Sequence, residues 1–218
     1  KVVHLNTYDG NGGAGRACLR LSDALKANGI DSKVLVYYKV GQNPAIDTFT
    51  KSPFQKAKAV YNIFSERYFA KWLSKSVKTP FSLQWFGRSV INHPDVKNAD
   101  IIHLHWVNHG FLNPKFLAQI DELEKPVVWT FHDSNAFTGG CHVRYGCEHF
   151  HQQCGNCPIL KISGPNDISH KTWLRKQKAY TELNFHIVTP SNWMAASVKF
   201  SSLLGTRKTS VIPNTIET

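Results

Sequence analysis

The stretch ADIIHLHWVNHGFLNPKFLAQIDELEKPVVWTFHD, residues 99–133, decides the fold. Its two ends, 99–106 and 125–133, are apolar runs rich in β-branched and aromatic residues, as expected of buried strands. The segment between them, 113–123, has a helical pattern and opens with Asn113, which can cap a helix, followed by a proline at the first helical position. Two strands joined through a helix form a βαβ unit. The stretch therefore predicts a parallel sheet.

The same alternation of strand and helix continues in both directions along the chain. Further strands are expected at 1–6, 32–38, 184–191 and 209–214, and further helices at 14–28, 54–78 and 193–204. Residues 40–53 are expected to form a loop. This order predicts an α/β fold with a doubly wound parallel sheet, Rossmann-like, in which residues 1–218 form a single domain.

The composition is that of an ordinary globular protein with a strong basic excess. Of 218 residues, 42% are hydrophobic and 19% are charged, and the formal net charge is +11. The sequence contains no run of eighteen apolar residues, and its first residues resemble a strand, not a signal peptide, so we expect a cytoplasmic protein. The charge favours an acidic partner, such as nucleic acid, an anionic lipid surface or a phosphate-bearing substrate. The alternative is an ordinary soluble domain with a basic surface. No nucleic-acid recognition motif is present, and we expect no nucleic-acid partner.

Glycines follow the first predicted strand, at the edge where a doubly wound sheet binds its ligands. The loop GNGGAGRA, residues 10–17, brings Gly12 and Gly13 to the start of a helix, whose free N–H groups attract anions. Arg16 lies in the first helical turn, where the helix dipole disfavours a cation unless a phosphate or carboxylate is nearby. The alternative is a glycine turn that only needs positive φ angles.

Histidines end two of the neighbouring strands. His132 and Asp133 close the strand at 125–133, and His105 and Trp106 close the strand at 99–106. A histidine at this edge can donate a hydrogen bond to a sugar or phosphate oxygen or move a proton, and an indole face suits the C–H face of a sugar. A lone histidine is more often structural, but the two adjacent strand ends favour a binding site.

The predicted helix at 54–78 combines basic and aromatic residues. One side of the helical wheel carries basic residues: Lys56, Arg67, Lys71, Lys75 and Lys78. An adjacent stripe is aromatic: Phe54, Tyr61, Phe64, Tyr68 and Trp72. Such a helix can lie on an anionic membrane, at the inner face of the plasma membrane for a cytoplasmic protein. The alternative is a helix that packs its aromatic stripe into the core and leaves its basic face in water.

Four of the five cysteines lie in one loop, at 139–158. Cys141, Cys147, Cys154 and Cys157 have the spacing C-x5-C-x6-C-x2-C, and two residues between thiolates allow both to reach one tetrahedral ion. We expect a structural zinc ion bound by these four residues and no catalytic metal, because a closed four-thiolate site has no open position. A histidine replacing one thiolate, disulfides, free buried thiols and an iron–sulfur cluster are the alternatives.

Together these segments resemble a known family of enzymes. The motifs are NGGAGRA, HLHWVN followed by GFL, PVVWTFHD, FTGGC, CGNCP, TPSNW and VIPN. In this order they resemble the N-terminal half of retaining family-4 glycosyltransferases, particularly those that assemble bacterial capsule, colanic-acid and O-antigen polysaccharide. The resemblance covers most of the chain and is weakest between residues 40 and 97.

The resemblance implies one half of a GT-B architecture, the N-terminal domain that holds the acceptor. A nucleotide-sugar would be bound mainly by a C-terminal donor domain, which is absent from this chain, so we expect the chain alone to be inactive. By resemblance, Gly12 and Gly13 approach the donor phosphates and the transferred sugar, and His132 is the cleft histidine that contacts that sugar. The remaining candidates for the acceptor, a saccharide or a lipid-linked saccharide, are Arg16, His105 and Asp133.

Two other classes of protein remain as alternatives. A metal-dependent hydrolase would use His103, His105, His132 and Asp133 as ligands, but no further acidic cluster completes such a site. A non-catalytic, zinc-stabilised basic module that binds an anionic membrane surface would explain the charge and the helix at 54–78 without any reaction.

Overall fold

A seven-stranded sheet forms the centre of the molecule in the computed structural model, which describes residues 1–10, 12–75 and 80–215. The strands are β1 (Val2–Tyr8), β2 (Ser32–Tyr38), β3 (Ile46–Thr48), β4 (Ile101–Leu104), β5 (Val127–Thr130), β6 (His186–Thr189) and β7 (Thr209–Val211). They are all parallel, in the order β3-β2-β1-β4-β5-β6-β7. The prediction of a doubly wound, Rossmann-like sheet is confirmed. The strand order reverses between β1 and β4, and this switch point is where such sheets bind ligands.

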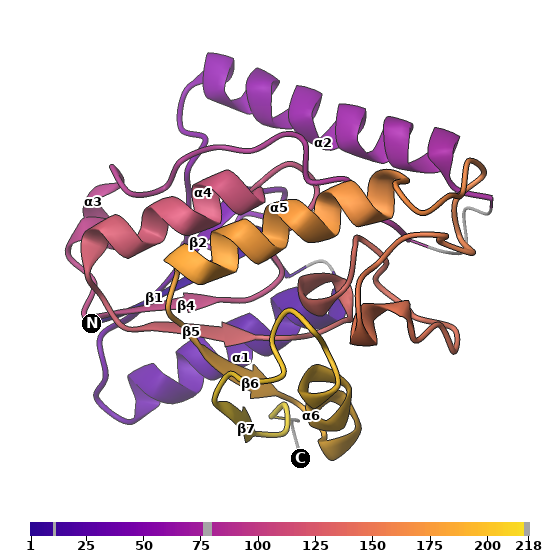
Figure 1. Ribbon diagram of the computed structural model, residues 1–218. Coiled ribbons are helices and arrows are strands. Elements are labelled where there is room, and N and C mark those ends of the chain that lie inside the picture. The colour runs from indigo at the N-terminus through magenta and orange to yellow at the C-terminus, as the bar shows by residue number, and fades with distance from the viewer. Residues whose placement is uncertain (11, 76–79, 216–218) are drawn as a thin grey trace.

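Helices cover both faces of the sheet (Figure 1). The α-helices are α1 (Gly12–Ala27), α2 (Pro53–Leu73), α3 (Pro94–Lys97), α4 (Pro114–Ala118), α5 (Ile168–Glu182) and α6 (Asn192–Lys199). Short 3-10 turns follow at η1 (Gln119–Leu123), η2 (Asn135–Phe137) and η3 (His149–His151). Helix α1 packs on β2 and β3 through Cys18, which joins a small cluster with Val34, Val36 and Ile46. The larger core lies on the opposite face, where side chains of α2, α4, α5 and α6 meet the alternate strand residues.

The two faces of the central strands differ in polarity. In the register of the sheet, His4 on β1 pairs with His103 on β4, and Leu5 pairs with Leu104. Side chains alternate between faces along a strand, so the leucines enter the larger core and the histidines lie on the face that α1 covers. All four side chains are buried. The expectation that both faces of the sheet are buried, with His103 and His105 on one of them, is confirmed.

Capping side chains fix where several helices begin. Asn113 accepts a hydrogen bond from the Phe116 N–H at 3.0 Å, with Pro114 at the first helical position, as the sequence predicts. Helix α2 starts with a capping box in which Ser52 and Gln55 satisfy each other's backbone N–H groups. Each cap satisfies donors that would otherwise be unpaired at the start of a helix.

The structure differs from the predicted elements in several places: among them, the short helix α3 was not predicted, and α6 ends at Lys199, before the predicted end of the helix at 193–204. The segment 40–53 contains β3, a three-residue edge strand too short to show a pattern. Helix α5 was not predicted, because its sequence is rich in lysine and polar residues and its few apolar side chains are spread out. Helix α2 ends at Leu73, before the predicted end of the helix at 54–78, and residues 76–79 lie outside the described part of the chain. Among the described residues, no helix has both the length and the apolar character needed to cross a bilayer.

Candidate functional site

A pocket of about 350 Å³ opens at the carboxyl edge of the sheet, beside the switch point. It is lined by Asn6, Tyr8, Gly12, Gly13, Ala14, Gly15, Trp106, His132 and Asp133. The structure therefore brings together four of the predicted site residues, the two glycines with His132 and Asp133. His105 lies directly behind His132. Arg16 does not line the pocket; its side chain is exposed on α1, one turn further along the helix.

The glycine turn leaves the first turn of α1 open to the pocket. Gly12 has a φ of +83°, and a Cβ atom at Gly12 or Gly13 would meet nothing within 4 Å. Gly15 is different, since a Cβ there would lie 2.9 Å from the backbone nitrogen of Gly10. Gly15 therefore lets the helix start close to the preceding loop, while the two earlier glycines leave space for a ligand. The positive end of the α1 dipole faces this space and favours an anion.

Four histidines form a connected stack behind the pocket. His132 Nε2 lies 3.2 Å from His105 Nδ1, and His105 Nε2 lies 3.1 Å from His4 Nδ1. His103 stacks on His105 with ring centroids 4.3 Å apart, and its Nε2 lies 2.8 Å from Thr130 Oγ1. The stack extends from the pocket into the layer between α1 and the sheet.

Burial keeps these imidazoles neutral. It lowers the pKa of His132 and of His4 to about 4 and that of His103 to about 3, and it holds the pKa of His105 well below the ordinary value. A neutral imidazole has one donor and one acceptor nitrogen. The two hydrogen bonds that link His4, His105 and His132 can therefore run either from His4 toward His132 or from His132 toward His4.

The surroundings of His4, the histidine furthest from the pocket in this series, favour the direction from His4 toward His132. His4 Nε2 is buried and has no hydrogen-bond partner among the described residues. An unpaired buried N–H is rarer than an unpaired buried acceptor, which favours a proton on His4 Nδ1, donated to His105. His105 then donates to His132 Nε2, and the proton of His132 lies on Nδ1. In this arrangement His132 offers the pocket a donor.

Asp133 connects the pocket to the cysteine-rich loop. Its Oδ2 accepts hydrogen bonds from Trp106 Nε1 at 2.7 Å and from His142 Nδ1 at 2.6 Å, and its Oδ1 accepts from the Asn135 N–H at 2.8 Å. Burial alone would raise the pKa of the Asp133 carboxyl, but the attraction of His142 and these hydrogen bonds hold that pKa below its ordinary value. With three donors already bound, Asp133 orients the Trp106 ring at the pocket wall.

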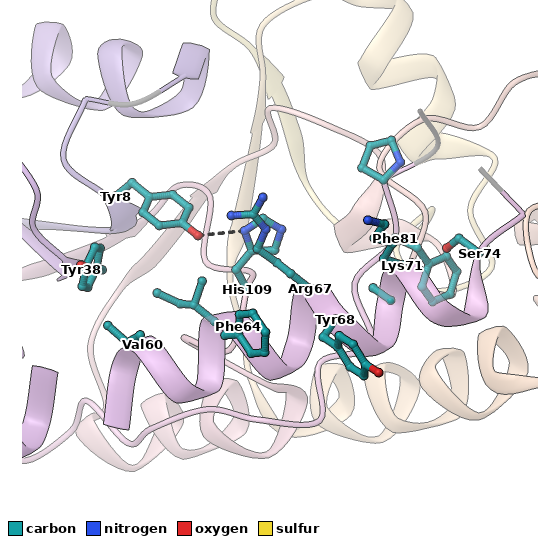
Figure 2. Close-up of a pocket in the computed structure, with 13 residues that line it drawn as sticks. Tyr8, Tyr38, Val60, Phe64, Arg67, Tyr68, Lys71, Ser74, Phe81 and His109 are labelled. Atoms are coloured by element: carbon teal, nitrogen blue, oxygen red, sulfur yellow. Dashed lines mark hydrogen bonds between the residues drawn. The ribbon is translucent and has the colours of Figure 1, made fainter. Parts of the chain in front are cut away.

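A much larger groove, of about 1080 Å³, adjoins the pocket along α2 (Figure 2). Its walls are mainly apolar and aromatic, with Tyr8, Tyr38, Val60, Ile63, Phe64, Tyr68 and Phe81, and its basic residues are Arg67 and Lys71. Tyr8 also lines the smaller pocket, so the two hollows meet at this residue. Tyr8 Oη lies 2.9 Å from His109 Nδ1, and this contact marks the junction (Figure 2).

The aromatic stripe of α2 faces outward. Phe54, Tyr61, Phe64, Tyr68 and Trp72 are 79%, 63%, 67%, 57% and 61% exposed. Apart from Ile63, the residues that α2 buries are small or polar, among them Ala59, Asn62 and Glu66. Glu66 accepts a hydrogen bond from the Gln84 N–H at 2.6 Å and so anchors the helix without using its aromatic side chains. The alternative in which the stripe packs into the core is wrong. Lys78, at the end of the basic side, lies outside the described residues.

The ligand set of the alternative metal-dependent hydrolase is not assembled. Among the described residues, the ligand atoms that gather within 4.8 Å of one another belong to His4, His103 and His105, all of which are buried. Asp133, which that set required, directs its carboxylate to Trp106, His142 and Asn135 instead. The reactive edge of the sheet therefore offers hydrogen-bond donors and an aromatic face.

Two buried residues of this region were missed from the sequence. His4 completes the histidine stack, although it lies about a hundred residues from His105 in the chain. Lys176 on α5 is fully buried, and its Nζ donates to the backbone oxygens of Asn135 and Thr138 and to Asn135 Oδ1. Burial lowers the pKa of Lys176 to about 7. A lysine on a polar helix gives no sequence signal that distinguishes it from a surface residue.

The fold and the pocket define a class of protein: an α/β domain with an open, glycine-rich helix start, a histidine and an indole ring in one pocket at its topological switch point. Comparison with known proteins identifies the family. Residues 11–218 match Glycosyltransferase Family 4, and the chain belongs to this family. It is also 30% identical over 128 residues to an Escherichia coli K12 protein named "Putative colanic acid biosynthesis glycosyl transferase WcaC". That alignment covers 54% of this chain and 31% of the relative, so the chain matches about a third of the relative's length.

The buried histidines predict that acid destabilises the fold. Each folded-state pKa of His4, His103 and His132 is below the ordinary value of about 6.5, so the unfolded chain takes up protons first as the pH falls. Above about pH 7 these histidines are neutral in both the folded and the unfolded chain, so they give the unfolding free energy no pH dependence. Below about pH 6.5, each should remove up to about 1.4 kcal/mol of unfolding free energy per pH unit, down to its folded pKa.

Denaturant unfolding between pH 7.5 and 5 measures this slope. His103→Gln, which cannot take up the proton, should make the slope shallower. The matched control is Thr130→Val, which removes the same hydrogen bond from His103 but keeps the imidazole, so it should lower stability without changing the slope. An unfolding free energy that stays constant across this range would contradict the prediction.

Proposed function

We propose that this chain is the acceptor-binding domain of a retaining GT-B glycosyltransferase. The enzyme would transfer a sugar from a nucleotide-sugar to a saccharide or lipid-linked acceptor during cell-surface polysaccharide synthesis. The observation that carries the proposal is the shared pocket of Gly12, Gly13, Trp106 and His132 at the switch point of the sheet. Membership of Glycosyltransferase Family 4 and the similarity to a protein named for colanic acid biosynthesis support it.

Each wall of the pocket suits one part of a nucleotide-sugar. The open first turn of α1 offers backbone N–H groups and a positive dipole end to the diphosphate. Trp106 offers a flat apolar face to the sugar ring, and Asp133 holds this indole through its Nε1. His132 donates from Nδ1 to a sugar hydroxyl. The nucleotide itself would be held mainly by a second domain, so the 218 residues alone should not turn over.

The proposed reaction needs no metal at this site. The bond between the anomeric carbon and the diphosphate oxygen breaks as the acceptor oxygen forms its bond on the same face of the sugar, which retains the anomeric configuration. The acceptor proton passes to the departing phosphate oxygen. The negative charge that develops on this oxygen is stabilised by the oriented N–H groups of α1, an electrostatic contribution that is already in place before the reaction begins.

The large groove along α2 would hold the acceptor. Its aromatic walls match the lipid part of a lipid-linked saccharide, and Arg67 and Lys71 match an anionic phosphate group. The exposed aromatic stripe and the net charge of +11 would hold α2 against an anionic membrane surface. A saccharide attached to such a lipid would then reach the pocket past Tyr8.

The full-length enzyme provides the test of the reaction. It should bind a nucleotide-sugar and form a product whose anomeric configuration, read from proton coupling constants by NMR, is that of the donor. The isolated 218-residue chain should show no turnover under the same conditions. An inverted product would refute the retaining mechanism, and a full-length protein that binds no nucleotide-sugar would refute the function.

The histidine chain makes a specific prediction about the rate. In the full-length enzyme, His132→Ala should lower kcat by about 10²- to 10³-fold, which is typical for loss of one oriented donor. His105→Leu keeps the His132 ring but removes its partner, and we expect about a tenfold lower kcat, equivalent to one hydrogen bond. His105→Gln, which can still pair with His132 Nε2, should recover part of this loss.

The control for the histidine chain is His103→Leu, since His103 stacks on His105 but does not contact His132 through a hydrogen bond. Its kcat should stay close to that of the unmodified enzyme. If His105→Leu also left kcat unchanged, His105 would have no role in positioning His132.

The groove makes a prediction about acceptor binding. Phe64→Ser and Tyr68→Ser should each raise KM for a lipid-linked acceptor by about tenfold or more, because each removes an aromatic contact with the lipid. KM for a water-soluble acceptor should not change. Both variants should also sediment less with vesicles that contain anionic lipid.

Phe200→Ser is the matched control, because Phe200 is 63% exposed but follows α6 and does not line the groove. It should bind vesicles and acceptor normally. Equal KM values for the lipid-linked acceptor in all three variants would contradict the assignment of the groove.

A further inference from the structure

The cysteine-rich loop contains a cluster of thiols that the glycosyl transfer does not use. Cys154 and Cys157 are buried, and Cys141 and Cys147 are partly buried. None of these residues forms a disulfide. The loop connects β5 to α5 and has only 3-10 turns of its own, so its backbone has few regular hydrogen bonds to hold it (Figure 1).

Backbone N–H groups point at the sulfur atoms. Cys154 Sγ accepts from the Gly139 N–H at 3.0 Å, and the backbone N–H groups of Ile159 and Leu160 lie close enough to the Cys157 sulfur to favour its thiolate form. Donors arranged in this way stabilise a thiolate more than a thiol, since hydrogen bonds to a charged acceptor are the stronger ones. They are also the usual neighbours of thiolates bound to a metal ion.

The buried side chain of Lys176 lies near the same thiols. The ammonium group of Lys176 is bonded to backbone and side-chain oxygens of η2 and Thr138, and negative charge on the sulfurs of Cys154 and Cys141 would attract it. Four thiolates around a divalent ion carry a net charge of about −2, which is costly to bury unless it is compensated. Lys176 and the N–H groups provide this compensation.

We propose that Cys141, Cys147, Cys154 and Cys157 bind one Zn²⁺ ion as thiolates, in a closed structural site. Binding releases the four thiol protons and leaves no open coordination position. The nearby histidines fit less well. His142 uses both ring nitrogens, toward Asp133 and Ser82, and His149 Nδ1 lies 2.8 Å from the Gly155 oxygen.

The four sulfur atoms lie near one another but not yet at the spacing of a zinc site. Cys147 interacts electrostatically with Cys141, Cys154 and Cys157. No three of the four sulfur atoms all lie within 4.8 Å of one another, whereas the edge of a tetrahedral zinc–thiolate site is about 3.8 Å. Binding of the ion would therefore draw the thiolates closer together.

The ion would stiffen one wall of the substrate pocket. Residue His142, next to Cys141, holds the Asp133 carboxylate, and Asn135 Nδ2 donates to the Gly140 oxygen at 2.8 Å. Both contacts run from the cysteine-rich loop to the segment that follows His132. Loss of the ion should therefore loosen Asp133 and the indole that it holds.

Metal analysis of the full-length protein tests the proposal. Elemental analysis should find about one zinc per chain, and Co²⁺ substitution should give the near-ultraviolet thiolate-to-cobalt absorption and the visible bands of a tetrahedral thiolate site. Cys157→Ser should lose most of the zinc. Cys18→Ala is the matched control, because Cys18 is also a buried cysteine but lies on the inner face of α1, away from the loop, and it should keep the ion.

Several results would overturn the zinc site. Protein purified without chelator that holds less than about a tenth of an equivalent of zinc and takes up no Co²⁺ has no such site. Iron with sulfide, or cysteines that resist alkylation until a reductant is added, would assign the thiols to a cluster or to disulfides. Because the Co²⁺ spectrum is measured on the unmodified protein, the test holds even where Cys157→Ser fails to fold.

Discussion

The carboxylate of Asp133 is the contact on which the site depends. It accepts hydrogen bonds from the end of β4 through Trp106, from the cysteine-rich loop through His142 and from the start of η2 through Asn135. Three segments that are separate in sequence therefore meet at one buried charge. Removal of any donor would leave part of that charge unpaired, which is costly inside a protein. The charge of Asp133 therefore holds the pocket wall in place, directly beside His132, which lines the same pocket.

The polar face of the central strands has a different physical origin. A parallel sheet is normally apolar on both sides, yet here the face under α1 carries His4, His103 and His105, buried and neutral. Burying these rings is tolerated because most of their nitrogens pair with each other or with Thr130. The hydrogen bonds from His4 through His105 thereby pass orientation from a buried strand to the His132 ring, which lines the pocket. The same buried, neutral rings that orient His132 at neutral pH are predicted to lower the stability of the fold in acid.

The sequence was sufficient for the sheet and for most of the pocket. Strand ends of a parallel sheet share one edge, so Gly12, Gly13, His132 and Asp133 could be placed together from the motif order alone. The position of Arg16 could not, because a helix turns by about 100° per residue and the phase of α1 follows from its packing on β2. His4 and Lys176 were missed for a related reason. Their neighbours are set by strand register and by the packing of α5, and neither leaves a local pattern.

The two hollows share a wall, and this wall would separate the proposed donor from the proposed acceptor. Tyr8 stands at the end of β1 and lines both the pocket and the groove, with its hydroxyl held by His109. A donor placed at the start of α1 fills the pocket from one side of Tyr8, and an acceptor lying along α2 approaches from the other. Burial lowers the pKa of His109 to about 3, so this imidazole is uncharged at neutral pH. The positive charge at the junction comes instead from Arg67, whose guanidinium lies beside His109 and acts on both His109 and Tyr8 (Figure 2). In the proposed complex, a phosphate at the point where the two hollows meet would therefore find a cation there, and Lys71 would offer a second one further along α2.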